Sequence, residues 1–187
     1  QDTRTALGLL VAEELSVPAS SVRLVMGDTD LCPYDAGTFG SRSMPDAGPA
    51  MRAVAASARE HLKEMAAELW GLPNPAGIAR DGRIVDPNGD REVTYARLVA
   101  GRRRLATGSW DPPMTPADGW ETAHQPAPNA RGRAIVTGTK RYVTDLTRPG
   151  ALVGRVLRAP SYQARLASLD LADALAIPGV TAVPEDD

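Results

Sequence analysis

Residues 38–43, Thr-Phe-Gly-Ser-Arg-Ser, combine groups that a polar-ligand site uses. The segment offers serine hydroxyls, the guanidinium of Arg42 and a backbone without a side chain at Gly40, just before a long helical pattern. Backbone N–H groups at a helix start favour negative charge, and a guanidinium can grip phosphate or carboxylate with two hydrogen bonds. The sequence therefore indicates an anion or polar-ligand site at the start of a helix.

Ordinary helix capping is an alternative interpretation of the same residues. Ser43 or Asp46 would cap the helix, while Pro45 and Pro49 would be tolerated in or before its first turn. Because caps are far commoner than ligand sites, the pattern taken alone favours capping.

The loop that contains these residues runs from Gly27 to Pro49, between a predicted strand and a predicted helix. Val22–Met26, VRLVM, is β-branched and apolar, which predicts a buried strand, and Gly27-Asp28 predicts the turn that ends it. Apolar residues then recur at helical spacing from Met51 to Leu69, and Gly71 with Pro73 predicts the end of that helix.

Two stretches resemble the molybdenum hydroxylases of the xanthine oxidase family. The first joins Gln1–Asp30, QDTRTALGLLVAEELSVPASSVRLVMGDTD, to Gly37–Gly48, GTFGSRSMPDAG. In that family a glycine-glutamine-glycine turn, a helix and a strand lead to a small-residue loop against the molybdopterin cofactor. The sequence departs from the family at Asp2, where glycine is usual. The resemblance implies cofactor contacts from Gln1, Thr38, Phe39, Gly40, Ser41, Arg42 and Ser43.

The second stretch, Val136–Val183, is similar to the hammerhead-like α/β segment of the same family. Here the pterin-contacting segment precedes the hammerhead-like one, an order that resembles the isoquinoline 1-oxidoreductase branch. The resemblance implies a large subunit that hydroxylates an N-heteroaromatic compound or an aldehyde with oxygen derived from water. It places the glutamate base of the family outside this chain, so we assign no catalytic residue and expect the isolated chain to be inactive.

The resemblance also implies the cofactors and partners. The cofactor is molybdopterin, alone or as its cytosine dinucleotide, and its own sulfurs hold the molybdenum, so no metal ligand is assigned to the protein. The expected partners are the remainder of the large subunit, a ferredoxin-like [2Fe–2S] subunit and a cytochrome or flavin subunit. The rival hypothesis is a non-enzymatic anion-binding or assembly module of a larger complex.

Composition limits the classes of function. A net charge of -2 gives no basic excess for a nucleic-acid partner, and no run approaches the ~18 apolar residues of a membrane span. A single cysteine excludes an internal disulfide and a cysteine-held cluster. The compartment stays open between cytoplasm and periplasm, and we interpret the chain, which opens without methionine, as a piece of a longer protein.

Other residues receive structural interpretations. Glu13 and Glu14 lie in a predicted helix from Arg4 to Leu15 and could suggest a catalytic carboxylate pair, but adjacent helical positions point about 100° apart, so the two cannot share a proton. Because charged residues on helices are mostly solvated, we interpret both as solvated helix charges. We interpret the aspartates of the loop as turn formers and Cys32 as a small buried hydrophobe. The aspartates are Asp28, Asp30 and Asp35.

The predicted class is α/β (α+β), in three parts. Residues 1–107 form a helix, strand and long-helix segment; residues 108–132, rich in proline, form a linker; residues 133–187 form a small hammerhead-like α/β domain, incomplete at its C-terminus. We expect Trp110 and Trp120 of the linker to dock within the chain.

Local signals predict smaller elements. We expect a hairpin around Asp81-Gly82 and a helix over 92–101 capped by Thr94, both peripheral to the first domain. In the last part we expect a turn leading into a strand over 136–145, strands over 151–160 and 180–183, and a helix over 168–177.

Overall fold

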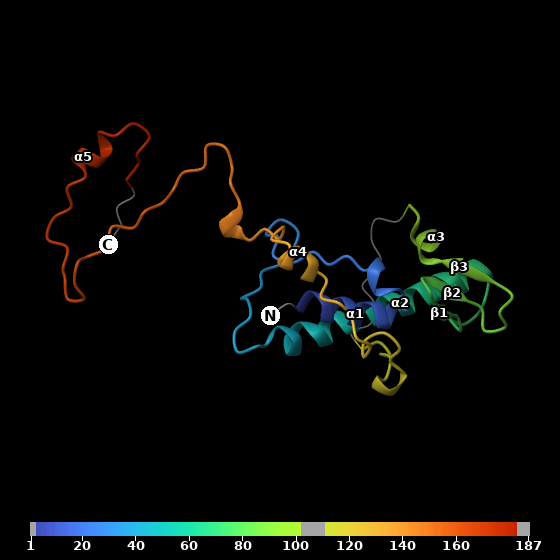
Figure 1. The fold of residues 1–187 in the computed structure, drawn as a ribbon. Helices are drawn as coiled ribbons and strands as arrows, with labels where there is room; N and C mark the ends of the chain where they lie inside the picture. The colour runs from blue at the N-terminus through green and yellow to red at the C-terminus, as the bar shows by residue number, and fades with distance from the viewer. Residues whose placement is uncertain (1–2, 102–110, 183–187) are drawn as a thin grey trace. The chain divides into compact units, whose positions relative to one another are not determined.

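The computed structural model describes residues 3–101 and 111–182, and its contacts divide the chain into two units, 1–140 and 141–187. Helices and one small antiparallel sheet confirm the mixed α/β class (Figure 1). The described elements of the first unit are α1 (Thr3–Leu15), a 3₁₀ turn (Ala19–Ser21), α2 (Ser43–Trp70), β1 (Ile78–Arg80), β2 (Arg83–Val85), β3 (Glu92–Thr94), α3 (Tyr95–Val99), a 3₁₀ turn (Ala117–Gly119) and α4 (Gly132–Val136).

Helices α1 and α2 pack side by side (Figure 1). Small residues allow this close approach, since Ala12 of α1 and Ala56 of α2 are fully buried. Helix α2 ends where Gly71 takes a left-handed conformation, φ 66°, and Leu72 N–H bonds back to the Ala67 carbonyl at 2.9 Å. The predicted end of the long helix is confirmed.

The predicted hairpin is also confirmed. Strands β1 and β2 pair in antiparallel register around Asp81 and Gly82, whose φ values of 46° and 73° are those of a type I′ turn. Strand β3 adds to β2 and brings Ile84 opposite Val93. Glycine tolerates positive φ without strain, which is why the Asp-Gly pair predicts this turn from sequence alone.

The hairpin belongs to the hydrophobic core, so the expectation of a peripheral position was wrong. Its Ile84 is fully buried, and it packs with Val93, Leu98 and the C-terminal half of α2. Burying such apolar side chains contributes about 1.5–3 kcal/mol each. The core residues are Leu62, Met65, Ala66, Ile84, Val93 and Leu98.

The helix expected over 92–101 is shorter, because its first three residues pair as β3. Helix α3 begins at Tyr95, and Thr94 caps it by accepting a hydrogen bond from Arg97 N–H at 3.2 Å, as predicted. The Tyr95 hydroxyl donates to the Leu15 carbonyl at 2.7 Å, which ties the start of α3 to the end of α1. Burial raises the pKa of Tyr95 to about 12.

The strand predicted over Val22–Met26 is not formed in the described part of the chain. Val22 has an extended backbone, φ -88° and ψ 117°, and burial alternates, with Val22 and Leu24 half-buried and Arg23 and Val25 exposed. A ladder needs a second strand, and no strand among the described residues pairs with this segment. The segment therefore has the pattern of a strand without its partner.

The second unit contains a 3₁₀ turn, Val143–Asp145, and α5, Ala172–Leu175. The helix expected over 168–177 is reduced to the four residues of α5, and its N-cap position is Leu171. Asp170, expected to open the helix, lies one residue earlier, where its carboxylate accepts from Ala172 N–H at 3.0 Å. The strands expected over 136–145, 151–160 and 180–182 are absent from the described residues, and 183 lies outside them. Their apolar side chains are exposed, Leu152 by 81% and Leu157 by 85%, so no sheet face covers them.

Among the described residues, no helix combines the length and the apolar character that crossing a bilayer requires.

Candidate functional site

The loop between Gly27 and the start of α2 is built from turns that its own side chains close. Asp28 accepts hydrogen bonds from Asp30 N–H at 3.0 Å and Leu31 N–H at 3.1 Å, and Asp35 accepts from Gly37 N–H at 2.7 Å. These contacts confirm the interpretation of Asp28 and Asp35 as turn formers. The described residues contain no group of three or more His, Cys, Asp or Glu side chains that could hold a metal ion.

Cys32 was expected to be buried, but it is half-buried. Its thiol donates to the Val25 carbonyl at 3.4 Å, so the sulfur fastens the loop to the end of the extended segment.

Residues 38–43 form a tight turn that leads into α2. Gly40 and Ser41 both have positive φ, 57° and 60°, and Arg42 N–H bonds to the Phe39 carbonyl at 3.2 Å. The hydroxyls of Thr38 and Ser43 lie 2.5 Å apart and bridge the two ends of the turn. The structure thus brings five predicted residues together around Gly40, with the Phe39 ring 73% exposed.

The start of α2 has no side-chain cap. Ser43 is the first helical residue, and Asp46 pairs with the Arg42 side chain at 3.2 Å instead of binding the helix start, so the prediction of either residue as N-cap was wrong. The first N–H groups of a helix have no acceptor within it, and Pro45 supplies none. The amides of Ser43 and Met44 therefore lie at an uncapped helix start.

Pro49 lies in the second turn of α2, beyond the position expected for it. Proline there removes the N–H that would bond to the Pro45 carbonyl. The long helix tolerates this loss because its later turns pack on α1 and the sheet.

The residues of this turn fit a ligand such as molybdopterin, whose phosphate and pterin edge carry hydrogen-bond acceptors. An added Cβ at Gly40 would meet no heavy atom within 4 Å, so the backbone is open to close approach. The Arg42–Asp46 pair is 73% and 58% exposed, and such pairs contribute about 0.5 kcal/mol, little enough for Arg42 to exchange Asp46 for a bound anion. Gln1, the remaining predicted contact, lies outside the described residues.

Glu14 is fully buried, so its interpretation as a solvated charge was wrong. Its carboxylate pairs with Arg52 and Arg59, each at 2.8 Å, and accepts from Thr115 N–H at 3.0 Å. Burial raises the pKa of Glu14, but hydrogen bonds from Thr115, Arg52 and Arg59 outweigh burial and hold the pKa below its usual value.

Glu13 is also buried, 7% exposed, and binds a different part of the same segment. Its carboxylate accepts hydrogen bonds from three consecutive amides, those of Glu121 at 3.1 Å, Thr122 at 2.6 Å and Ala123 at 2.8 Å. Adjacent helical positions do point apart, as expected, but here each carboxylate meets its own stretch of chain. Both glutamates are structural anchors.

The segment they hold, residues 113–123, crosses α1 and α2, and we call it the strap. Trp120 packs under the Arg52 guanidinium, with 5.1 Å from Arg52 Cζ to the ring centroid, and donates its indole N–H to the Thr115 carbonyl at 3.2 Å. Docking of Trp120 within the chain is confirmed, while Trp110 lies outside the described residues. Only one 3₁₀ turn, Ala117–Gly119, is regular within 111–131.

Comparison with known proteins identifies the family. A family model of the molybdopterin cofactor-binding domain matches residues 1–138. A nicotinate dehydrogenase subunit of Pseudomonas putida is 32% identical over 157 residues, which is 84% of this chain and 13% of that protein. The chain thus spans about an eighth of the length of that relative.

Shorter matches involve related subunits. The carbon monoxide dehydrogenase large chain of Afipia carboxidovorans is 36% identical over 37% of this chain and 8% of its own length. The 6-hydroxypseudooxynicotine dehydrogenase complex subunit gamma of Paenarthrobacter nicotinovorans is 36% identical over 54% of this chain and 13% of its own length. The chain therefore belongs to the molybdopterin cofactor-binding domain family of the molybdenum hydroxylase large subunits.

Proposed function

We propose that this chain is part of the large subunit of a molybdenum hydroxylase that oxidises an N-heteroaromatic compound or an aldehyde. When bound, the molybdenum cofactor would supply the redox centre for inserting oxygen derived from water. The proposal draws on two of the relatives described above, a nicotinate dehydrogenase subunit and a 6-hydroxypseudooxynicotine dehydrogenase subunit. The isoquinoline 1-oxidoreductase branch is part of this proposal and rests on the order of the two segments along the chain.

Within that enzyme, this chain positions the cofactor through residues 38–43. Gly40 lets the backbone approach the ligand, the hydroxyls of Ser41 and Ser43 and the amides at the start of α2 donate hydrogen bonds, and Arg42 supplies positive charge. Thr38 holds Ser43 in place, and the exposed face of Phe39 packs on the ligand. On the resemblance to the family's glutamine, the proposal also assigns a cofactor contact to Gln1.

The observation that carries this role is the uncapped start of α2 behind an open Gly40, inside the part of the chain that matches the cofactor-binding family. Side chains at a helix start often accept from its first N–H groups, which have no acceptor within the helix. Here the capping residues Ser43 and Asp46 are engaged with Thr38 and Arg42 instead.

The proposal extends to the partners and the cofactor form. The cofactor is molybdopterin or its cytosine dinucleotide, and electrons leave through a ferredoxin-like [2Fe–2S] subunit to a cytochrome or flavin subunit. The catalytic glutamate lies in the remainder of the large subunit, so the 187-residue chain alone has no hydroxylase activity even with added cofactor. Turnover of nicotinate or an aldehyde by the purified chain would refute that last statement.

The test measures molybdenum content of the intact complex carrying Arg42→Ala or Gly40→Val. A lost charge-assisted hydrogen bond is worth about 1.5–3 kcal/mol, which corresponds to about 10–100-fold weaker binding, so Arg42→Ala should lower molybdenum content with little change in melting temperature. Gly40→Val should lower it further, because the β-branched side chain occupies the space that the ligand needs.

Two variants serve as matched controls. Gly89 also has positive φ, 77°, and open space around it, so Gly89→Val reproduces the backbone strain of Gly40→Val away from the loop. Arg80→Ala removes an exposed guanidinium from β1. Both controls should keep full molybdenum content. If Arg42→Ala and Gly40→Val both keep full molybdenum content and activity, residues 38–43 form only a structural turn. If the unmodified complex contains neither molybdenum nor iron, the rival hypothesis of an anion-binding or assembly module is favoured.

A further inference from the structure

The loop that joins β2 to β3 contains the dipeptide Asn88-Gly89 (Figure 1). Gly89 N–H bonds to the Asp86 carbonyl at 2.7 Å, and Asp86 N–H bonds to the Arg91 carbonyl at 2.8 Å, so the loop is closed by a tight turn. The sequence fits this turn, because aspartate, proline and glycine are favoured at its first, second and fourth positions. We call residues 86–91 the β2–β3 turn.

The tip of the β2–β3 turn is open to solvent. Residues 87–90 are all exposed, and an added Cβ at Gly89 would meet no heavy atom within 4 Å. The backbone N–H of Asn88 donates to the Asp86 carboxylate at 3.0 Å, while none of the described residues bonds to its side-chain amide. The Asn88 side chain can therefore rotate toward the backbone of Gly89, and water reaches both residues.

An asparagine followed by glycine is suited to a reaction within the chain. The backbone nitrogen of the second residue can attack the side-chain carbonyl carbon of the first, and glycine hinders this attack least because it has no Cβ. Attack also requires Gly89 N–H to leave its hydrogen bond to Asp86. An exposed turn with few buried contacts opens at low cost in free energy, so this bond does not prevent the reaction.

We propose that Asn88 is a site of spontaneous deamidation. The Gly89 nitrogen forms a bond to the side-chain carbonyl carbon of Asn88, the bond from that carbon to the amide nitrogen breaks, and the Gly89 proton leaves with this nitrogen as ammonia. Water then adds to the succinimide ring and opens it at either carbonyl, which gives aspartate or isoaspartate. Water is the only co-reactant, and nothing is oxidised or reduced.

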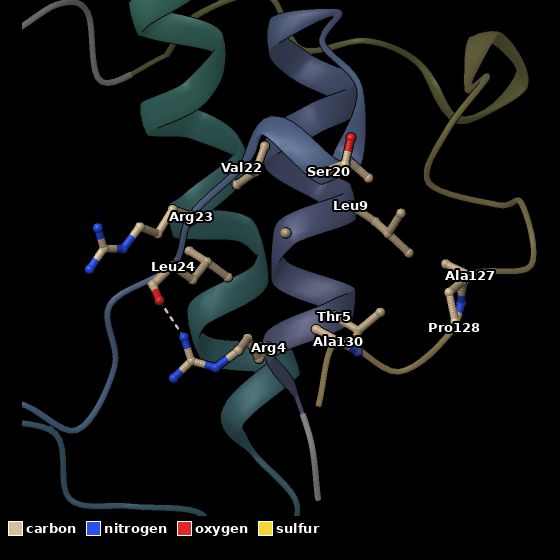
Figure 2. A pocket seen from close by; sticks show the side chains of 12 residues that line it. Arg4, Thr5, Leu9, Ser20, Val22, Arg23, Leu24, Ala127, Pro128 and Ala130 are labelled. Carbon is tan, nitrogen blue, oxygen red and sulfur yellow. Dashed lines mark hydrogen bonds between the residues drawn. The ribbon is translucent and has the colours of Figure 1, made fainter. Parts of the chain in front are cut away.

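The other two asparagines of the chain each lack a requirement of this reaction. Asn74 precedes Pro75, which has no N–H to lose. Asn129 precedes Ala130, whose Cβ hinders attack and whose N–H donates to the Thr5 hydroxyl at 2.9 Å. Ala130 lies beside Thr5 in the lining of a groove over α1 (Figure 2). Both asparagines therefore serve as internal controls.

Deamidation of Asn88 should loosen the attachment of the hairpin to the end of α2. The Asp86 carboxylate accepts from Arg91 at 2.6 and 2.9 Å. The Arg91 guanidinium in turn donates to the Trp70 carbonyl at 3.2 Å and lies 5.4 Å from the centroid of the Trp70 ring. Isoaspartate lengthens the backbone of the turn by one carbon, and either product adds a carboxylate close to that of Asp86. The hydrogen bonds that close the turn should then be weakened.

The first test incubates the intact complex in water enriched in heavy oxygen, at mildly alkaline pH because the attacking amide must lose its proton. Ring opening places heavy oxygen in the product, and trypsin then releases residues 84–91 for mass spectrometry. Fragmentation should assign the label to residue 88, at least about 10-fold faster than at Asn129 and without label at Asn74. Absence of label at residue 88, a rate no higher than that at Asn129, or aspartate without isoaspartate would overturn the proposal.

A glycine variant tests the attacking group. Gly89→Ala should slow labelling of Asn88 about 10-fold or more, because the added Cβ hinders attack. Gly101→Ala is the matched control, since Gly101 also has positive φ, 75°, and open space around it. This control should label Asn88 as fast as the unmodified complex does. If Gly89→Ala labels equally fast, the reaction does not pass through the Gly89 nitrogen and the proposal fails.

The second test measures hydrogen exchange of residues 84–91 before and after prolonged incubation of the complex. Incubation should speed exchange about 10-fold in the unmodified complex and leave Gly89→Ala nearly unchanged. Fresh Asn88→Asp, which carries the new charge without isoaspartate, should exchange more slowly than the incubated complex. Equal exchange before and after incubation, in a complex that has formed isoaspartate, would overturn the predicted loosening of the hairpin.

Discussion

The carboxylate of Glu14 and the guanidinium of Arg59 form an ion pair, with Oε2 and Nη1 2.8 Å apart, in which Glu14 is wholly shielded and Arg59 is only 12% exposed. Arg52 of the same helix pairs with the other carboxylate oxygen at 2.8 Å, and the amide and hydroxyl of Thr115 in the strap donate to Oε2 as well. Both oxygens of the buried carboxylate thus accept hydrogen bonds, and a buried charge is tolerated in a protein when it is paired and hydrogen-bonded in this way. One helical residue of α1 thereby holds α2 and the strap together.

Glu14→Gln should strongly destabilise the first unit. Removing one partner of a buried ion pair leaves the other charges uncompensated and costs about 3–5 kcal/mol. Glu64→Gln, at a side chain that is 61% exposed, is the control and should change stability by less than about 0.5 kcal/mol. Urea unfolding of the 187-residue chain measures both. Equal stabilities for the two variants would show that the buried pair contributes nothing net.

Stability should fall in acid because of Glu14. Its pKa is below the usual 4.5 in the folded chain, so the unfolded chain takes up the proton first as the pH drops. The contribution is present above about pH 4.5 and is lost as the pH falls through the lower folded pKa. The unfolding free energy should therefore decline below about pH 5, and less steeply in Glu14→Gln. In Glu14→Gln, part of the decrease in unfolding free energy with falling pH should remain, since Glu60 also has a lowered pKa. If the unfolding free energy falls equally steeply with pH in both proteins, Glu14 does not contribute to the acid sensitivity.

Glu13→Gln should open the strap locally. The carboxylate accepts from three consecutive amides, and bonds to an ionised acceptor are roughly twice as strong as neutral ones. Exchange of the amides at 121–123 should become about 10-fold faster or more, while Glu68→Gln leaves it unchanged. Unaltered exchange in Glu13→Gln would mean that Trp120 and Thr115 suffice to hold the strap.

Thr94→Ala should lower stability by about 1 kcal/mol, because α3 loses its cap and Leu98 loses part of its support in the core. Thr94→Ser keeps a hydroxyl at the same position and should recover most of the loss. If serine is as destabilising as alanine, the methyl group of Thr94 matters more than its hydrogen bond to Arg97.

The features that sequence predicted well are those fixed by neighbouring residues. The turn at Asp81-Gly82, the cap at Thr94 and the end of α2 at Gly71 each depend on backbone conformations available to a few residues. The grouping of residues 38–43 before a helix was also visible, because adjacent residues in a turn cannot be far apart.

What sequence missed depends on partners far along the chain. Glu13 and Glu14 looked like surface charges because their partners, at Thr115 and Glu121, lie 101 and 108 residues away. The strands expected over 22–26 and 151–160 did not form. Their β-branched composition shows that each segment could join a sheet, but it does not show whether a second strand lies next to it. Helix α2 lacks the expected N-cap because Ser43 bonds to Thr38 and Asp46 bonds to Arg42.

The neighbouring positions of Glu13 and Glu14 have a consequence for how the first unit unfolds. Glu13 binds the strap at residues 121–123, and Glu14, the next residue of α1, pairs with Arg52 and Arg59 of α2. Because both sets of contacts start from one turn of α1, unwinding of that turn releases the strap and the partner helix together. Local opening of the strap and separation of the two helices are therefore expected to form one cooperative unit.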